Sequence, residues 1–294
     1  MPDDLTEVRL PDDGLICPVV KSWAKQKYKI IGYYDSLFSA GMKNKWGKRV
    51  YIDLYAGAGY NKVEGTGEIL MGSPLIALSM AFPFDCYIFC EENAVKLEAL
   101  KQRVQRHAPK AYVTYVPGDC DTHVEEICAA IPRASAGNTA LSLCLVDPFD
   151  FGMKHVTLER LSRSFMDFLV LLAVGMDATR NQDYYIEGDS TKLDEAFGST
   201  DWRQRWGSPG VHKSRFRDFV AKEFAKSMES LGYRPQTLDQ MKLVKVPGNN
   251  LSLYYLALFS KHPTADKFWK QVLTYSDEQT SFDWGLNDVF KHDD

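Results

Sequence analysis

Short apolar runs alternate with amphipathic stretches along most of the chain. The apolar runs have the length of β-strands and lie at 50–54, 86–92, 111–119, 141–149 and 167–175. Between them, stretches such as 93–107 carry apolar side chains at the spacing of one helix face. Because the strand runs are apolar throughout and do not alternate with polar residues, they indicate a parallel sheet covered by helices on both faces.

The two ends of the chain and one internal stretch depart from this rhythm. Residues 1–20 are polar and contain prolines, which predicts an extended arm, and an amphipathic helix is expected at 21–37. Residues 176–240 are polar with a helix at about 213–231, which predicts a helical insertion. We therefore expect an N-terminal arm at 1–20 and one domain at 21–294 that carries the insertion at about 176–240.

The C-terminal part predicts a β-hairpin followed by a last helix. Two apolar runs at 241–246 and 251–259 flank the turn sequence Pro-Gly-Asn-Asn, and the helix is expected at 265–275. In the insertion, basic residues near two tryptophans allow a nucleic-acid surface, although an ordinary solvated face is favoured. These residues are Trp202, Arg203, Arg205, Trp206, Lys213, Arg215 and Arg217.

Composition narrows the class of protein. The 294 residues are 45% hydrophobic and 13% aromatic, which supports a large core and excludes a disordered chain. The formal net charge of −4 argues against a general coat for nucleic acid but leaves a local basic face open. The six cysteines form no C-x-x-C pair, and no signal-peptide pattern or membrane-spanning run occurs. We therefore expect reduced thiols, a cytoplasmic location and no membrane partner.

The stretch 50–61, VYIDLYAGAGYN, is the first candidate for a binding site. Its apolar run ends at Asp53, and Gly57 and Gly59 follow. A strand that ends in a glycine-rich turn lets backbone N–H groups approach a ligand closely. Because the acid precedes the glycines, the pattern favours a cationic, hydroxyl-rich ligand such as S-adenosylmethionine (SAM) over a pyrophosphate. A tight turn with an incidental Asp explains this stretch alone equally well.

A loop is expected at 61–73, between the glycine turn and the next helix. Pro74 suits the first turn of that helix and Ser73 suits its N-cap. A connection of this length between a strand and a helix would be able to close over a ligand.

Four successive strand runs end in an acid: Asp53, Glu91, Asp119 and Asp147. Ligands of open α/β sheets bind at the carboxyl ends of the strands, and SAM gives these acids a use. Asp53 would hold the methionine amino group, Glu91 the ribose hydroxyls, and Asp119 the adenine amine beside the N–H of Cys120. The predicted cofactor-binding residues are Asp53, Tyr55, Gly57, Gly59, Glu91, Asp119 and Cys120. A metal site at Asp121 and His123 is rejected because no third ligand stands at a useful spacing.

The sequence Asp147-Pro148-Phe149 resembles the D-P-P-Y type motif of amino-methyltransferases, with Phe149 in place of the second proline. In that motif the acid accepts hydrogen bonds from the target NH₂ and the aromatic ring stacks on a planar base. The base is generally extruded or single-stranded. The resemblance makes Asp147, Pro148 and Phe149 the catalytic candidates, and an ordinary strand-end turn is the alternative.

The chain as a whole resembles class I SAM-dependent methyltransferases, and more closely the three-Cys-motif partner protein (TcmP) family. The matching segments are 23–31, 51–59, 72–78, 87–93, 118–121, 145–152 and 173–181. The resemblance implies an α/β, Rossmann-like class I methyltransferase fold with a seven-stranded, mostly parallel sheet and an antiparallel C-terminal hairpin strand. It also implies genes that neighbour a three-Cys-motif protein resembling radical-SAM enzymes. By family position, Lys27 becomes a candidate for binding a carboxylate or phosphate, and Arg180 a candidate for binding a phosphate.

The sequence leaves three functional hypotheses. The first is a SAM-dependent methyltransferase that acts on an amino group, most plausibly of a nucleic-acid base. The second is a non-catalytic, methyltransferase-like module that partners a three-Cys-motif protein or binds a nucleic acid. The third is a nicotinamide-dependent oxidoreductase, which the acid before the glycines and the terminal hairpin disfavour.

Overall fold

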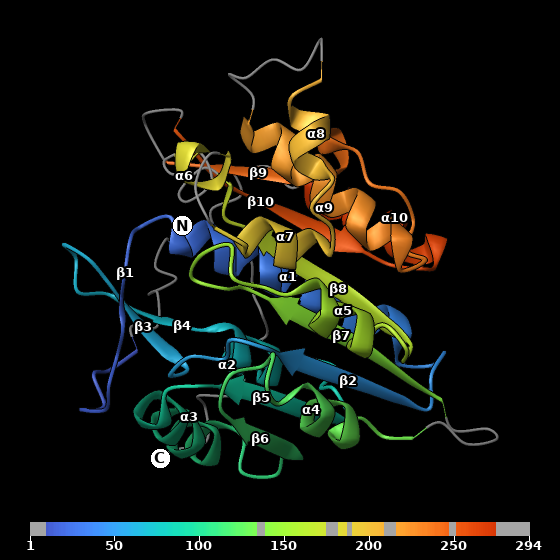
Figure 1. The fold of residues 1–294 in the computed structure, drawn as a ribbon. Helices are drawn as coiled ribbons and strands as arrows, with labels where there is room; N and C mark the ends of the chain where they lie inside the picture. The colour runs from blue at the N-terminus through green and yellow to red at the C-terminus, as the bar shows by residue number, and fades with distance from the viewer. Residues whose placement is uncertain are drawn as a thin grey trace, which may run out of the picture.

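The computed structural model describes residues 10–133, 139–174, 182–186, 190–208, 216–246 and 251–274. Its centre is a seven-stranded sheet (Figure 1). The strands follow one another across the sheet as β6 (Val113–Pro117), β5 (Cys86–Glu91), β2 (Lys48–Asp53), β7 (Ala140–Val146), β8 (Met166–Leu172), β10 (Ser252–Phe259) and β9 (Lys242–Lys245).

Strand directions establish the fold class. The five strands from β6 to β8 pair in parallel, whereas β10 pairs antiparallel with both β8 and β9. The order along the chain reverses between β2 and β7, which makes these neighbours the topological switch point. The predicted Rossmann-like class I methyltransferase fold, with an antiparallel strand delivered by a C-terminal hairpin, is confirmed. The turn of that hairpin, 247–250, lies outside the described residues.

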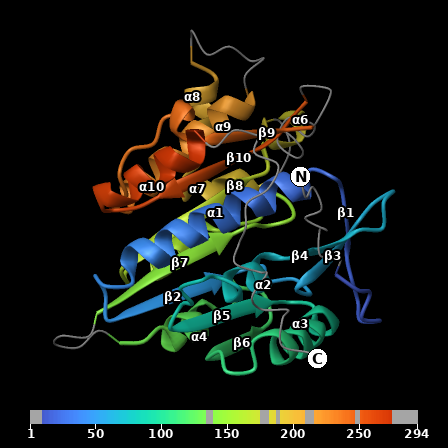
Figure 2. The ribbon, with the colours of Figure 1, turned by 180° about the vertical axis from the view of Figure 1, so that it is seen from behind.

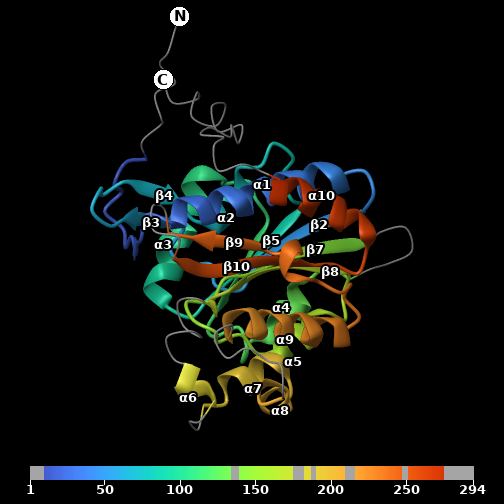
Figure 3. The ribbon, with the colours of Figure 1, turned by 90° about the horizontal axis from the view of Figure 1, so that it is seen from above.

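Helices cover both faces of the sheet, as seen from above in Figure 3. One face carries α1 (Ala24–Met42), α2 (Ser73–Leu78) and α10 (Pro263–Thr274), which come forward in Figure 2. The other face carries α4 (Val124–Ala130), α5 (His155–Leu161), α7 (Lys192–Phe197) and α9 (Phe216–Ser230). Neighbouring residues of β2 enter different cores, Tyr51 on the α1 face and Ile52 on the α5 face, because successive side chains of a strand point to opposite faces.

A second, three-stranded sheet corrects the loop expected at 61–73. Strands β3 (Tyr60–Val63) and β4 (Ile69–Met71) form an antiparallel hairpin, and β1 (Val19–Val20) pairs in parallel with β3. Gly65 and Gly67 adopt positive φ angles in the turn, which allows the chain to reverse there. Residues 10–20 thus contribute a strand, while the division into an arm and a domain stays a prediction.

The insertion is helical where it is described, with α6 (Gln182–Ile186) and α8 (Trp202–Trp206) in addition to α7 and α9. Trp202 and Trp206 are buried and pack against Phe216. They are therefore core residues and are not exposed stacking platforms. Lys213 and Arg215 lie outside the described residues.

The arginines beside these tryptophans are engaged within the chain. Arg203 forms an ion pair with Asp194, and Arg205 forms one with Glu223 at 2.7 Å. The nucleic-acid surface considered for this segment is thereby disfavoured, because the rings are covered and both cations already have acidic partners.

Candidate functional site

The four predicted acids meet at one edge of the central sheet, which we call the carboxyl edge. Asp53 is the last residue of β2 and Glu91 is the last residue of β5. Asp147 directly follows β7, and Asp119 follows β6 after one residue, Gly118. Parallel pairing of these strands brings their ends to the same side, next to the switch point between β2 and β7.

Asp53 is fully buried and held by two hydrogen bonds. The Ser73 hydroxyl donates to its Oδ2 at 2.6 Å and the Tyr55 N–H donates to its Oδ1 at 3.1 Å. Burial raises the pKa of Asp53 to about 7, although both hydrogen bonds oppose this rise. Ser73 is not the N-cap that the sequence suggested, because Gly72 occupies that position and the Ser73 side chain binds Asp53.

The two glycines of the turn have different surroundings. Gly57 and Gly59 have φ angles of +66° and +85°, which residues other than glycine rarely adopt. A Cβ added to Gly57 would meet nothing within 4 Å, whereas one added to Gly59 would lie 3.0 Å from Leu100 and 3.3 Å from Leu75. Gly57 therefore borders open space where a ligand can approach the backbone, and Gly59 is required by packing.

Glu91 fixes the glycine turn to the neighbouring strand. Its Oε2 accepts a hydrogen bond from the Gly57 N–H at 2.8 Å, and its Oε1 accepts one from the Asn93 N–H at 2.9 Å. The residue is 7% exposed. Since a carboxylate offers about four lone-pair sites, these two bonds leave acceptor capacity for ligand hydroxyls.

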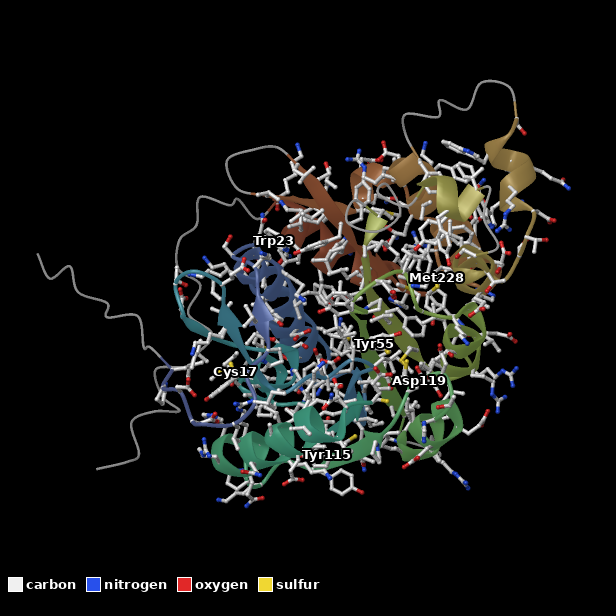
Figure 4. The ribbon with its side chains drawn as sticks, turned by 60° about the vertical axis from the view of Figure 1, so that its left-hand side comes forward. Cys17, Trp23, Tyr55, Tyr115, Asp119 and Met228 are labelled. Atoms are coloured by element: carbon white, nitrogen blue, oxygen red, sulfur yellow. The ribbon has the colours of Figure 1, made fainter. Side chains whose placement is uncertain are left out.

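Asp119 and Cys120 lie on the loop after β6, close to Tyr55 (Figure 4). The Oδ1 of exposed Asp119 accepts hydrogen bonds from the N–H groups of Asp121 and Thr122 at 2.9 and 3.0 Å. The Cys120 thiol lies beside Tyr55, and burial raises the pKa of Cys120 to about 12. Cys120 is therefore a buried, neutral thiol at this loop.

Asp147 is bound by a lysine from the first helix. The Nζ of Lys27 lies 2.7 Å from Oδ2 of Asp147, and their side chains are 17% and 13% exposed. Burial is the largest influence and by itself lowers the pKa of Lys27, but the Asp147 carboxylate together with Tyr28 and Tyr254 outweighs burial, and the pKa is raised. Lys27 is therefore a permanent cation at the carboxyl edge. The sequence indicated it only by family position and gave no sign of its partner.

The other two catalytic candidates contrast in exposure. Pro148 is buried, whereas Phe149 is 100% exposed. Such a ring is free to stack on a planar group. Arg180 lies outside the described residues. His155 follows the Asp147-Pro148-Phe149 motif closely in the sequence. Its ring forms a hydrogen bond with the Ser227 hydroxyl at 2.6 Å, where α5 meets α9.

Two tyrosines join the site without having been singled out from the sequence. Tyr28 and Tyr254 both act electrostatically on Lys27, and the Tyr28 hydroxyl accepts a hydrogen bond from Asn61 at 2.9 Å. Tyr254 belongs to β10, whose apolar run resembles that of any buried strand. No local sequence signal distinguishes these residues, because only the fold brings α1 and β10 to Asp147.

The part of the chain that the structure describes shows neither a metal centre nor a membrane-spanning helix. No cluster of three or more His, Cys, Asp or Glu side chains there is arranged to hold a metal ion. None of the described helices is long and apolar enough to cross a membrane. All six cysteines are free thiols.

Comparison with known proteins yields structural similarity only. No family model and no curated protein matches the chain. Among solved structures, a Legionella pneumophila protein of the DUF519 family is 14% identical with a TM-score of 0.47, over 84% of this chain and 91% of that one. Trm1 from Pyrococcus horikoshii, solved with SAM, is 10% identical with a TM-score of 0.44, over 88% and 61%.

A third similar structure is the magnesium protoporphyrin IX methyltransferase of Synechocystis, solved with SAH. It is 12% identical with a TM-score of 0.41, over 81% of this chain and 84% of that one. At these identities and TM-scores the likenesses carry no argument about the chemistry of this chain. The resemblance to the TcmP family therefore stays a prediction.

Proposed function

We propose that this protein is a SAM-dependent methyltransferase that methylates an amino group of a nucleic-acid base. The observation that carries the proposal is the convergence of Asp53, Glu91, Asp119 and Asp147 on the carboxyl edge. They surround a glycine turn with open space at Gly57, next to the switch point where ligands of such sheets bind.

The donor and acceptor set fits SAM better than a dinucleotide. Asp53 would hold the methionine amino group, and Glu91 would accept from the ribose hydroxyls with its remaining lone pairs. Asp119 and the Cys120 N–H would bind the adenine edge. A pyrophosphate would be repelled by this concentration of carboxylates, whereas a sulfonium and an ammonium are attracted by it.

Bound SAM would supply an electrophilic methyl group on sulfur. In the chain itself, Asp147 would accept a hydrogen bond from the target amino group and orient its lone pair. Lys27 holds Oδ2 of Asp147 at 2.7 Å, so the second oxygen would take that role. Catalysis of this kind rests mainly on positioning.

The full exposure of Phe149 bears on the acceptor. An exposed ring two residues after Asp147 offers a stacking surface near the acid that would orient an amino group. Base-on-ring stacking is available to an unpaired or extruded base and is blocked in an intact duplex. We therefore favour RNA or single-stranded DNA as the acceptor, and the free thiols agree with a cytoplasmic location.

Calorimetric titration of SAM and of its demethylated product tests the cofactor site. Wild type is expected to bind both, and Asp53→Asn and Glu91→Gln are expected to bind at least about tenfold more weakly, equal to about 1.4 kcal/mol. Glu92→Gln is the matched control, because Glu92 adjoins Glu91 but is exposed. Absence of binding by the wild type would overturn the proposal.

Transfer of labelled methyl groups from SAM to RNA or single-stranded DNA tests the catalytic assignment. Asp147→Asn is expected to retain SAM affinity and lose transfer, because the amide donates where the carboxylate accepts. Normal transfer by Asp147→Asn would remove Asp147 from the assigned role.

A non-catalytic module that partners a three-Cys-motif protein is the second candidate. The observation that favours it is the Lys27–Asp147 ion pair, which engages the acid that an amino acceptor would need. Co-purification of a partner together with SAM binding and no methyl transfer to any nucleic acid would support this candidate over the first.

A further inference from the structure

Arg103 of helix α3 (Ala94–His107) joins the N-terminal segment to the glycine turn. Its side chain is fully buried and pairs with Asp13, with Nη2 at 2.7 Å from Oδ1 and Nε at 2.9 Å from Oδ2. Its Nη1 donates to the carbonyl of Ile16 at 3.0 Å and to the carbonyl of Ala58 at 2.6 Å. The guanidinium group also lies 4.5 Å from the ring centroid of Tyr60.

Ala58 stands between the two glycines of the turn, so Arg103 acts on the turn directly. The same turn is held elsewhere by backbone bonds from Ala56 N–H to Cys90 and from Gly72 N–H to the Gly59 carbonyl, at 2.9 and 2.7 Å. Glu91 holds the Gly57 N–H. Of these contacts, that of Arg103 is the one that brings in residues 13–16.

We propose that Arg103 is a positioning residue for the cofactor site, and that Asp13 and the carbonyl of Ile16 complete it, so that residues 13–16 help to set the glycine turn for SAM. This inference rests on the proposed function. It assigns to the N-terminal segment an indirect role in cofactor binding, which acts through Arg103 and the carbonyl of Ala58.

Charge and geometry both suit this role. The hydrogen bonds from Arg103 lower the pKa of Asp13 to about 2, so the carboxylate is ionised at any working pH. Arginine presents several N–H donors in one rigid plane, which lets it reach a carboxylate and two carbonyls together. Lysine has a single nitrogen and is unable to span Asp13, Ile16 and Ala58 at once.

Arg103→Lys keeps the charge and removes this span, and Arg106→Lys is the matched control. Arg106 lies on the same helix and binds the same Asp13 carboxylate at 3.1 Å, but its side chain is 52% exposed. Hydrogen exchange of the ligand-free proteins is compared at the amides of Ala56 and Gly57 and at those of strand β8. SAM affinity is then measured by calorimetry.

We expect Arg103→Lys to speed exchange at Ala56 and Gly57 by about tenfold relative to β8, and to raise the Kd for SAM by about tenfold. Arg106→Lys should change neither quantity. Asp13→Asn, which leaves Arg103 in place, should show the same pattern with a smaller effect, and it serves where Arg103→Lys does not fold.

Three results would overturn the inference: unchanged exchange at the turn, equal acceleration in β8, or faster exchange at the turn with unaltered SAM affinity. If the wild type binds no SAM, the proposed function fails and so does this role in cofactor binding. The exchange comparison then decides separately whether Arg103 holds the turn, so the two failures are distinguishable.

Discussion

The Nζ of Lys27, in helix α1, lies 2.7 Å from the Oδ2 of Asp147, at the end of β7. The two residues are 120 positions apart in the sequence, and both side chains are largely buried. A buried charge that loses its partner costs more than the pair itself contributes, so each residue fixes the other. The acid of the Asp147-Pro148-Phe149 motif is thus tied to the first helix of the domain.

Lys27→Met is expected to lower the free energy of unfolding by about 2 to 4 kcal/mol, because it leaves the Asp147 carboxylate without a counter-ion. The double variant with Asp147→Asn should recover part of this loss. Urea unfolding measures both. Lys25→Met is the control, since its ion pair with Glu68 is 41% and 36% exposed and should be worth less than about 0.5 kcal/mol. Equal losses in Lys27→Met and Lys25→Met would contradict the buried-pair argument.

SAM affinity is expected to fall as pH decreases from 8 to 6. Burial raises the pKa of Asp53 to about 7, so the carboxyl becomes protonated across this range and no longer attracts the methionine ammonium. The limiting change is about tenfold in Kd for each pH unit below the pKa. Calorimetry at three pH values tests this, and Asp53→Asn should bind weakly with no such slope. A slope that persists in Asp53→Asn would assign it to another group.

The central sheet was predictable because its parallel strands are built around mostly apolar runs. Runs such as Cys86–Glu91 and Ala140–Val146 are buried along their whole length and so carry a strong signal. The β3–β4 hairpin was missed because Tyr60–Val63 is short and polar at its centre, and because its partner β1 lies some forty residues earlier. Its pairing depends on tertiary structure.

The candidate site was predictable in its acids and not in their partners. Asp53, Glu91 and Asp147 stand at strand ends that the sequence marks clearly. Ser73 was expected to cap a helix, but its hydroxyl donates a hydrogen bond to the buried Asp53 carboxylate instead. Lys27 reaches Asp147 only through the fold, since no local pattern pairs a helix lysine with a distant strand end.

Gly57→Ala and Gly59→Ala should separate ligand binding from packing. Both residues have positive φ angles, so each alanine brings a strain of about 1 kcal/mol. Only at Gly59 would the new Cβ also press on Leu100, at 3.0 Å, and lower stability further. Gly57→Ala should instead place a methyl group in the open space beside the turn and weaken SAM binding. Thermal unfolding and calorimetry distinguish the two, and equal stability losses would contradict the assignment.

Phe149→Ala is expected to leave stability within about 0.5 kcal/mol of wild type, because the ring is fully exposed. If the ring stacks on the acceptor base, the variant should raise KM for the acceptor by about tenfold. This factor corresponds to the lower end of the about 1–3 kcal/mol that stacking on one base contributes. Its SAM affinity should be unchanged. Phe82→Ala is a control, since Phe82 is also exposed but contacts Lys43 away from the carboxyl edge. An unchanged KM would remove Phe149 from the acceptor site.

The burial of Asp35 is expected to make the stability of the protein depend on pH. Its side chain in α1 is completely buried, and neither oxygen has a hydrogen-bond partner among the residues that the structure describes. Burial raises the pKa of Asp35 well above its ordinary value of 3.8, and the charge of Asp53 adds to the rise. The folded state therefore keeps a proton that the unfolded chain loses above that value, so stability falls as pH rises from about 4 toward the folded pKa.

Asp35→Asn removes the titrating carboxyl group, and with it this contribution to the pH dependence of stability. The variant should lose less stability than wild type between pH 5 and pH 8, and should be more stable at pH 8 by about 1 to 3 kcal/mol. Burial also raises the pKa of Asp53 and of Asp167, each to about 7, but both residues remain in the variant, so the difference between the curves belongs to Asp35. Urea unfolding at each pH gives the curves, with exposed Glu92→Gln as control. A variant whose stability falls as steeply as wild type would show that Asp35 is ionised in the folded protein, which would require a partner for its carboxylate.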